Sequence, residues 1–384
     1  MKIAHIIPTY FPAVRYGGPI HAVHDLCKNL TTRGHEVDVF TTNVDGDNSI
    51  GPAGSEVTYI DGVGVQYFPV SRPRRLYYSP RLAAALDSRV KEYDLLHLHS
   101  AFLYPTLKAA RCAFKNRIPY IVAPRGMLIK EMVRRRNSIV KNAWIALFER
   151  RTVEQASAVH VTSALEADEI RKFRFALPPI REIPNGIKFP SSDFDTKREP
   201  NTLLFLGRID WKKGIERLLS ALVDLDGTRL IVAGNDESGY IQKLRSLSER
   251  LGVRGRVSFV GPVAGEEKWR LFRRASAFVL PSYSENFANT VLEAMAMECP
   301  VIVTPEVGLA HTVSSSGAGV VTAGESASLA TAIRRVLEDP EMALTMGQKG
   351  KAIVEDEFSW TKITVAMESA YHEVVEEHRR QSFA

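Results

Sequence analysis

The stretch AFVLPSYSENFANTVLEAMAM, residues 277–297, contains the repeating unit from which the fold is built. Its first four residues are an apolar run typical of a buried strand, and Pro281–Asn286 follow as a polar loop. After the loop, apolar residues recur at three- and four-residue spacing, which predicts a helix that buries Val291, Leu292, Met295 and Ala296. Asn289 or a neighbouring residue is expected to cap it. A buried strand, a loop and a helix in this order form the unit of a parallel α/β sheet.

Outward from this stretch, the same order of strand and helix runs along the chain. In the first half, strands are predicted at KIAHII, HEVDVFTT, DLLHLHS, PYIVAP and SAVHVTS. In the second half they are predicted at TLLFLG, RLIVAG, VSFVG, AFVL and PVIVTP. Helical segments lie between strands, and the one after KIAHII buries Ile20, Val23, Leu26, Cys27 and Leu30. This alternation predicts parallel sheets that are covered by helices on both faces.

The alternation breaks at residues 183–201, where proline, serine and charged residues cluster without apolar periodicity, as expected of a linker. We therefore expect two α/β domains, residues 1–190 and 191–384. Ligands of such sheets bind outside the carboxyl ends of the strands, so the cleft between the domains is the expected site. A last helix, FSWTKITVAMESAYHEVVEEHRRQ, has a stripe of Trp360, Ile363, Met367 and Tyr371. It packs either on the first domain or as a cap on the second.

Composition narrows the class of protein. Of 384 residues 45% are hydrophobic and 24% charged, which is ordinary for a globular chain. The three cysteines form no CxxC pair, so a disulfide framework or zinc site is not expected. The apolar run before Pro8 is too short for a signal peptide, and no window reaches 18 apolar residues. The protein is expected to be soluble and cytoplasmic.

The net charge of +6 is unevenly distributed, because residues 1–190 carry +10 and residues 191–384 carry −4. The basic excess gathers at Arg72–Arg75, Arg134–Arg136 and Arg150–Arg151. It forms a solvated basic face, or it meets an anionic membrane surface or an anionic substrate. Nucleic acid is not an expected partner, because no helix-turn-helix or RNA-binding signature is present.

Four charged residues of the second half carry the candidate chemistry. Arg208 and Lys213 follow strand TLLFLG, where they are placed to neutralise a phosphate. Glu285 and Glu293 flank the start of the helix after AFVL, and a helix start is itself an anion site. Carboxylates repel phosphates but accept hydrogen bonds from vicinal sugar hydroxyls. Together they suggest a sugar nucleotide. The alternative is that the cations are solvated and the acids are ordinary helix residues.

The chain also resembles a known family. GRIDWKKG, VSFVGPV and ENFANTVLEAMAMECPVIVTPEVG occur in the order found in the donor domain of retaining glycosyltransferases of the GT-B fold, family-4 type. PTYFPAVRYGGPIHAVHDLCKNLTTRGHEVDVFTT is similar to that family's opening strand, glycine loop and helix. The resemblance spans nearly the whole chain. It implies two Rossmann-like domains facing across a cleft, and a sugar transfer from a nucleotide sugar with retention of configuration.

The resemblance also implies roles for individual residues. Arg208 and Lys213 match the pair that binds the donor diphosphate and steadies the leaving group, and Glu285 lies near the donor sugar as a third catalytic residue. Glu293 matches the glutamate that holds the ribose hydroxyls. The implied donor-binding residues are Gly17, Gly18, Asn286, Phe287, Ala288, Asn289, Thr290 and Glu293.

The chain departs from the family pattern at three positions. Asn286 and Ala288 stand where glycines commonly flank the phenylalanine, and Asn286 adds a side chain that can touch the sugar. Arg125 follows strand PYIVAP where many members have a histidine. Arg125 can bond the donor sugar or an anionic acceptor, but it cannot act as a base near neutral pH. His99, at the end of DLLHLHS, is a second candidate for the cleft; it is equally compatible with a structural role.

No metal or other cofactor is expected. The two DxD sequences, Asp45–Asp47 and Asp224–Asp226, follow the pattern of polar turns. Two other functions remain open. A sugar-nucleotide epimerase of the same fold would share the diphosphate site, and a carbohydrate-binding protein would lack turnover. A nicotinamide dehydrogenase is excluded, because no GxGxxG follows a predicted strand.

The acceptor is expected to be a carbohydrate or a lipid-linked oligosaccharide of a bacterial surface polysaccharide. The RRR sequence and the following SIVKNAWIALFERR form an amphipathic segment suited to an anionic membrane surface, or else a core-packed helix with a basic outer side. The sequence does not distinguish a UDP-linked from a GDP-linked donor.

Overall fold

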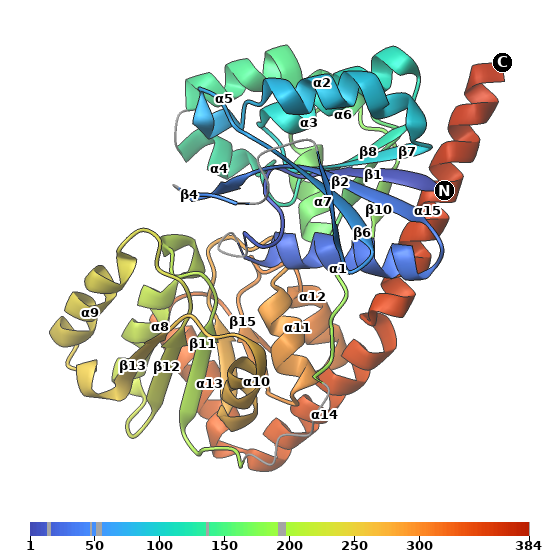
Figure 1. Ribbon diagram of the computed structural model, residues 1–384. Helices are drawn as coiled ribbons and strands as arrows, with labels where there is room; N and C mark the ends of the chain where they lie inside the picture. Colours follow the sequence, from blue (N-terminus) through green and yellow to red (C-terminus); the bar gives the residue numbers. More distant parts are fainter. Residues whose placement is uncertain (14–16, 47, 51–55, 136–137, 191–196, 384) are drawn as a thin grey trace. The chain divides into compact units, whose positions relative to one another are not determined.

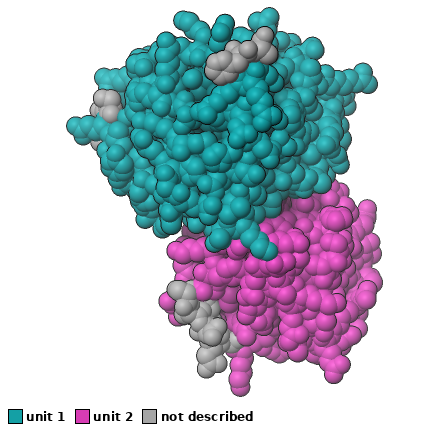
Figure 2. Space-filling view, turned by 90° about the vertical axis from the view of Figure 1, so that its right-hand side faces the viewer, with its two compact units in different colours: residues 1–186, 360–384 teal, residues 187–359 magenta. Residues whose placement is uncertain are grey.

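The computed structural model describes residues 1–13, 17–46, 48–50, 56–135, 138–190 and 197–383. The chain divides into two compact units (Figures 1 and 2). Unit 1 consists of residues 1–186 and 360–384, and unit 2 of residues 187–359. The first boundary lies close to the predicted division after residue 190. At the second boundary, the terminal helix belongs to unit 1, which is one of the two arrangements that the sequence left open. Among the residues described, no helix is long and apolar enough to span a membrane.

Unit 1 is an α/β unit, as predicted from the alternation of strands and helices. Its strands in chain order are β1 (Lys2–Ile6), β2 (Glu36–Thr42), β3 (Val44–Asp45), β4 (Asn48–Ser49), β5 (Val57–Ile60), β6 (Val63–Phe68), β7 (Leu95–His99), β8 (Tyr120–Ala123), β9 (Ala158–Val161) and β10 (Ile180–Glu182). Its helices are α1 (Gly18–Thr32), α2 (Pro80–Arg89), α3 (Tyr104–Asn116), α4 (Lys130–Arg135), α5 (Ser138–Trp144), the π-helix η4 (Ile145–Glu149), α6 (Arg150–Glu154), α7 (Ala164–Arg171) and α15 (Trp360–Phe383). Within the described residues the main sheet has the order β10-β9-β8-β7-β1-β2-β6-β5.

One edge of this sheet departs from the prediction. β5 pairs antiparallel with β6, whereas the other neighbouring strands of the main sheet run parallel. Asp61 and Gly62 form the two-residue turn between them, both with positive φ, at 51° and 83°. An Asp-Gly pair is a strong hairpin signal because it tolerates this left-handed backbone. The expectation of a wholly parallel sheet was wrong at this edge.

The terminal helix α15 completes the core of unit 1. Its predicted stripe is buried: Trp360 is 9% exposed, Met367 1% and Tyr371 0%. These side chains share one hydrophobic cluster with residues of α1 and of strands β1, β2 and β6. Of the two packing arrangements that the sequence left open, the structure has the one on the first domain.

Unit 2 is a second parallel α/β unit. Its strands are β11 (Thr202–Leu206), β12 (Arg229–Ala233), β13 (Val257–Gly261), β14 (Ala277–Leu280), β15 (Val301–Val303) and β16 (Gly319–Val321). Its α-helices are α8 (Ile215–Ala221), α9 (Tyr240–Arg250), α10 (Gly265–Arg274), α11 (Asn289–Ala296), α12 (Ala310–Ser316), α13 (Ser326–Glu338) and α14 (Pro340–Glu357). The sheet order among these residues is β13-β12-β11-β14-β15-β16, with parallel neighbours throughout. The fold class predicted from the sequence is thereby confirmed for both units.

The described residues also include short 3-10 helices, and the one that contains Lys213 belongs to the candidate site. They are η2 (Arg74–Leu76) and η3 (Val90–Glu92) in unit 1, and η5 (Trp211–Lys213), η6 (Leu222–Asp224) and η7 (Arg254–Arg256) in unit 2. The cysteines Cys27, Cys112 and Cys299 are buried and free, in agreement with the absence of a disulfide framework.

Candidate active site

Two loops of unit 2 meet at one edge of its sheet. β11 and β14 are neighbouring parallel strands, so the loops after them begin side by side. The backbone N–H of Tyr283 donates to the carbonyl of Lys212 at 2.7 Å. The Arg217 guanidinium donates to the carbonyl of Pro281 at 3.2 Å and lies 3.5 Å from the centre of the Tyr283 ring. The two predicted segments, GRIDWKKG and PSYSEN, are therefore one structural feature.

Gly214 allows this close approach. Its φ is 65°, and a Cβ atom added there would lie 2.1 Å from the carbonyl oxygen of Pro281. Any side chain would push the loops apart, so the final glycine of GRIDWKKG has a packing reason as well as a backbone one. Asp210 fixes the other end of the turn, because its carboxylate accepts from the N–H of Lys212 at 3.0 Å.

Lys213 and Glu285 form an ion pair across the two loops. Their side chains are 16% and 18% exposed, so the pair is mostly shielded from solvent. Glu285 is fixed at its backbone by the loop after β15: its N–H donates to the carbonyl of Glu306 at 3.0 Å, and its carbonyl accepts from Gly308 at 2.9 Å. The predicted catalytic cation and the predicted sugar-binding acid thus lie side by side.

Gly207 directly follows β11, and Arg208 is the next residue. The Arg208 side chain is exposed. Within the described part of the chain, no carboxylate pairs with it. The adjacent Ile209 is buried, and its N–H donates to the carbonyl of Asn235 at 2.8 Å. The backbone under Arg208 is therefore fixed while its guanidinium stays available to a ligand.

The start of α11 differs from the expected capped helix. Ala288 occupies the N-cap position with φ 79° and ψ 70°, and no side chain caps the helix. Of the residues expected to cap it, Asn289 is the first residue of the helix, and the neighbouring Ala288 holds the N-cap position without a side-chain hydrogen bond. A left-handed backbone at this position favours glycine, since an L side chain there costs roughly 1–2 kcal/mol. Phe287 and Ala288 are buried, while Asn286, Asn289 and Thr290 are partly exposed.

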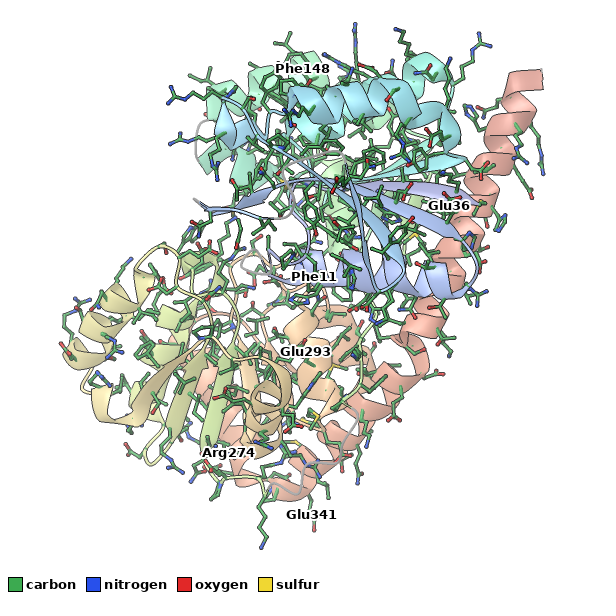
Figure 3. All side chains as sticks on the ribbon, in the orientation of Figure 1. Phe11, Glu36, Phe148, Arg274, Glu293 and Glu341 are labelled. Carbon is green, nitrogen blue, oxygen red and sulfur yellow. The ribbon has the colours of Figure 1, made fainter. Side chains whose placement is uncertain are left out.

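Glu293 lies on the second turn of α11 (Figure 3) and bonds a lysine that the sequence did not single out. The Lys268 ammonium on α10 donates to its Oε1 at 2.7 Å. Burial raises the pKa of Glu293, and Lys268 opposes that rise. Lys268 escaped detection because it lies in a charged helix 25 residues away, without a pattern that ties it to Glu293.

In unit 1, Gly17 and Gly18 begin α1. Gly17 is the N-cap with φ 83°, and Gly18 is the first helical residue. The left-handed backbone gives Gly17 a conformational reason to be glycine. The two glycines belong to unit 1 and the other predicted donor-binding residues to unit 2.

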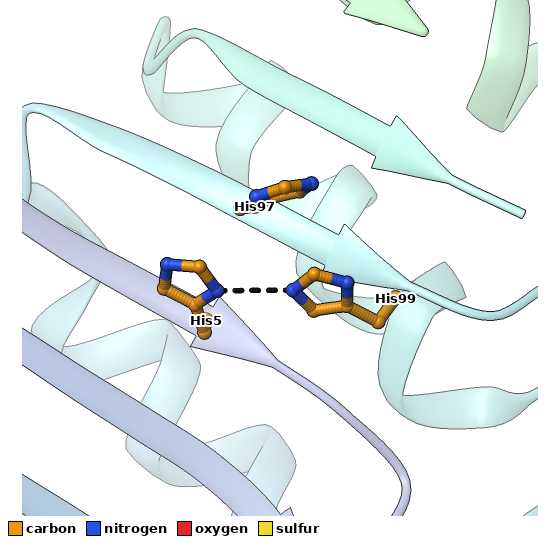
Figure 4. A group of neighbouring side chains, drawn as sticks. All are labelled: His5, His97 and His99. Atoms are coloured by element: carbon orange, nitrogen blue, oxygen red, sulfur yellow. Dashed lines mark hydrogen bonds between the residues drawn. The ribbon is translucent and has the colours of Figure 1, made fainter. Parts of the chain in front are cut away.

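His99 and Arg125 also belong to unit 1 and lie at the carboxyl ends of the neighbouring strands β7 and β8. Arg125 Nη2 lies 3.5 Å from His99 Nδ1, so the two predicted residues are in contact. The sequence reasoning missed the three histidines around them. His5, His97 and His99 lie together on one face of the sheet (Figure 4), with His160 next to His97. A signal existed, because three strands that are otherwise apolar each contain a histidine.

Of the two DxD sequences, Asp224–Asp226 precedes β12, at the amino end of the strand and away from the loops described above. Asp47 of the other sequence lies outside the described residues, as does Arg136 of the predicted RRR segment.

Comparisons with known proteins cover nearly the whole chain. A family model described as "Glycosyl transferases group 1" matches residues 189–353, and one described as "Glycosyl transferase 4-like domain" matches residues 17–186. An uncharacterized glycosyltransferase of Methanocaldococcus jannaschii is 28% identical, over 97% of this chain and 98% of the relative.

Solved structures show the same fold. Sucrose-phosphate synthase from Thermosynechococcus elongatus has a TM-score of 0.79 at 24% identity, covering 98% of this chain and 99% of that one. Anabaena HepE in complex with UDP and glucose has a TM-score of 0.77 at 21% identity, covering 97% and 100%. The two family matches adjoin where the units divide, and each lies within one unit. The chain belongs to the group 1 glycosyltransferases of the GT-B type.

Proposed function

We propose that the protein moves a sugar from a UDP- or GDP-linked donor to a carbohydrate or lipid-linked acceptor, with retention of anomeric configuration and without a metal ion. The observation that carries this proposal is the Lys213–Glu285 ion pair at the carboxyl edge of the unit 2 sheet, with the exposed Arg208 in the same loop as Lys213. The neighbouring HepE structure, which holds UDP and glucose, supports a nucleotide sugar as donor. The product class that we propose is a bacterial surface polysaccharide.

The proposed chemistry breaks one bond and forms another on the same face of the sugar. The bond from the anomeric carbon to the diphosphate breaks, and the acceptor oxygen bonds to that carbon. The acceptor proton passes to an oxygen of the departing diphosphate. Arg208 and Lys213 stabilise the charge that develops on the diphosphate, which is the kind of preorganised electrostatic effect that dominates many enzymes. Two cations next to the phosphates supply the role that a divalent ion would have.

The Lys213–Glu285 ion pair fits this chemistry. In the structure the charges of Lys213 and Glu285 neutralise each other. Neither charge is therefore left unpaired in a position that is largely shielded from solvent. When a diphosphate draws Lys213 toward itself, Glu285 becomes available to accept from hydroxyls of the donor sugar. Glu293 has the same relation to Lys268 and is proposed to accept from the ribose hydroxyls.

A panel of UDP- and GDP-linked sugars, each with a mixture of sugar acceptors, tests the proposal. We expect nucleoside diphosphate to be released with one donor, and EDTA should not affect this release. The product should keep the donor's anomeric configuration, as measured by NMR.

Glu293→Gln should raise the donor KM about tenfold, since it removes a charge-assisted hydrogen bond. Glu355→Gln, an exposed acid of α14, is the matched control and should not change KM.

Other outcomes of this panel identify the alternatives. An epimerase returns the nucleotide sugar intact with altered stereochemistry. A carbohydrate-binding protein releases no nucleoside diphosphate with any acceptor. Loss of activity in EDTA would overturn the metal-independent mechanism.

We propose further that unit 1 rests on an anionic membrane surface through residues 138–154, the segment α5-η4-α6. Three apolar side chains on it are well exposed: Ile139 at 84%, Val140 at 69% and Leu147 at 63%. Arg150 and Arg151 follow directly and are also exposed. Apolar side chains beside basic ones are typical of helices that lie in a membrane interface.

Vesicle flotation tests this proposal. The protein should float with phosphatidylglycerol vesicles at low salt, and less so at high salt because the attraction is screened. The double change Ile139→Ser and Val140→Ser should lower the bound fraction about tenfold or more, given the apolar area removed. Tyr59→Ser, at a side chain of unit 1 that is 75% exposed, is the control. No binding at low salt would contradict the proposal.

A further inference from the structure

Four buried histidines of unit 1 form two hydrogen-bonded chains whose direction can be worked out. His160 Nε2 lies 2.8 Å from the carbonyl of Ile183, so this nitrogen donates. His160 Nδ1 then accepts from His97 Nε2 at 3.2 Å. His97 Nδ1 in turn accepts from the hydroxyl of Tyr371 at 2.7 Å. Every bond in this chain is satisfied with both imidazoles neutral.

The second chain ends at an arginine. Arg125 Nη2 donates toward His99 Nδ1 at 3.5 Å, so His99 Nε2 carries its proton and donates to His5 Nδ1 at 3.0 Å (Figure 4). Burial lowers the pKa of His5 and of His160 to about 3, which agrees with neutral rings. His5, His97 and His99 are near enough to share a cation. The proton between His5 and His99 and the guanidinium beside His99 disfavour that use.

Among the described residues, the guanidinium of Arg125 has only neutral hydrogen-bond partners. Besides His99, its Nη1 donates to Asn185 Oδ1 at 3.0 Å, and its Nε has no partner among the described residues. The nearby carboxylate of Glu166 is already engaged, because it accepts from the N–H groups of Gly126 at 2.7 Å and Thr162 at 2.9 Å. Burial lowers the pKa of Arg125, and the nearby charge of Glu166 opposes that fall only in part, so the guanidinium keeps a net penalty for its burial.

The backbone around Arg125 is strained in the way that binding sites often are. Arg125 has φ 54°, and in the adjacent loop after β7, Ser100 has φ 80° and Phe102 φ 61°. Each non-glycine residue in the left-handed region destabilises the fold, and three of them follow two neighbouring strands here. Such residues cluster at binding and active sites. Both loops follow the carboxyl ends of parallel strands, where ligands of such sheets bind.

We propose that Arg125, held by His99 and Asn185, binds an oxyanion of the acceptor, either a phosphate or a carboxylate carried on a sugar. The inference rests on the proposed function, because it takes unit 1 to hold the acceptor. A guanidinium offers parallel N–H donors that match two oxygens of such a group. His99 is a positioning residue: as a neutral acceptor it orients the guanidinium without neutralising it.

Binding of inorganic phosphate tests the site without turnover. Phosphate should raise the Tm of the wild-type chain, and Arg125→Gln should weaken the apparent phosphate affinity about tenfold or more. The charge-matched control is Arg81→Gln, at an exposed arginine of α2, which should respond like the wild type. The wild type and Arg125→Gln are then compared again with Lys213→Ala added to each of them, because this second change removes the proposed phosphate-binding cation of unit 2. Without phosphate, Arg125→Gln should be at least as stable as the wild type; a lower Tm would indicate a structural charge and overturn the proposal.

Acceptor preference tests the role in transfer and separates the two anions. Glucose, glucose 6-phosphate and glucuronate are compared as acceptors, and one charged sugar should have a KM about tenfold or more below that of glucose. Arg125→Gln should abolish this preference.

His99→Leu should raise the KM for the charged sugar with little change in kcat. His99→Asn, which keeps an acceptor atom, should restore the low KM. Equal preference in wild type and Arg125→Gln would overturn the inference while leaving the transferase intact. Arg125-dependent phosphate binding without any transfer would instead count against the proposed function alone.

Discussion

Lys213→Ala is expected to lower kcat about 10²–10³-fold, the loss typical of removing one group that stabilises developing negative charge. Lys213 is proposed to meet the leaving diphosphate, and the close approach of Gly214 to the carbonyl of Pro281 fixes the turn that carries it. The measurement is release of nucleoside diphosphate with the donor that the panel identifies.

The control for this change is Lys243→Ala, which removes an exposed lysine of α9 in the same unit. It should leave kcat unchanged. Glu285→Gln separates positioning from charge, because it leaves Lys213 without its ion-pair partner. If Lys213→Ala turns over at a near-normal rate, Lys213 is not the catalytic cation.

Gly234→Ala is expected to destabilise unit 2 by about 3 kcal/mol or more, the range of strained and sterically blocked backbone positions. Gly234 directly follows β12 and has φ 145°; an added Cβ would lie 1.8 Å from the carbonyl oxygen of Gly207. Backbone atoms on both sides cannot yield as a flexible side chain would. Since Gly207 directly follows β11, the displacement would also reach the loop that carries Arg208 and Lys213.

Gly239→Ala is the matched control for this prediction. Gly239 also has positive φ, at 71°, but a Cβ there would meet nothing within 4 Å. The control should therefore lose only about 1 kcal/mol, from the left-handed backbone alone. Urea unfolding, together with hydrogen exchange of β11 and β12, measures the difference. Equal losses in the two variants would show that the close approach to Gly207 is not a constraint.

The periodicity of the sequence predicted most of the fold, because buried strands and amphipathic helices differ in spacing. It could not predict the partner of the terminal helix. The stripe that contains Met367 and Tyr371 shows that one face is buried, but not against which surface. The Asp61–Gly62 pair would have predicted the β5–β6 hairpin, but the interpretation of the sequence did not include it.

The candidate site was only partly visible in the sequence. Arg208, Lys213 and Glu285 could be singled out because each follows a strand whose carboxyl end was predictable. Their roles stay predictions. Lys268 is one charged residue among many on an outer helix, so only the folded chain shows that it meets Glu293. The histidines around His99 come from three strands, and their contacts depend on the sheet order.

The position of α15 has a consequence for synthesis of the protein. Unit 1 is interrupted, since its core includes Tyr371 and Met367 from a segment that follows the whole of unit 2. A nascent chain can complete the unit 2 sheet while the larger, earlier sheet still lacks one of its covering helices. Domains usually fold in the order in which they leave the ribosome. Here the part made first is expected to mature last, with its apolar face exposed until residues 360–383 emerge.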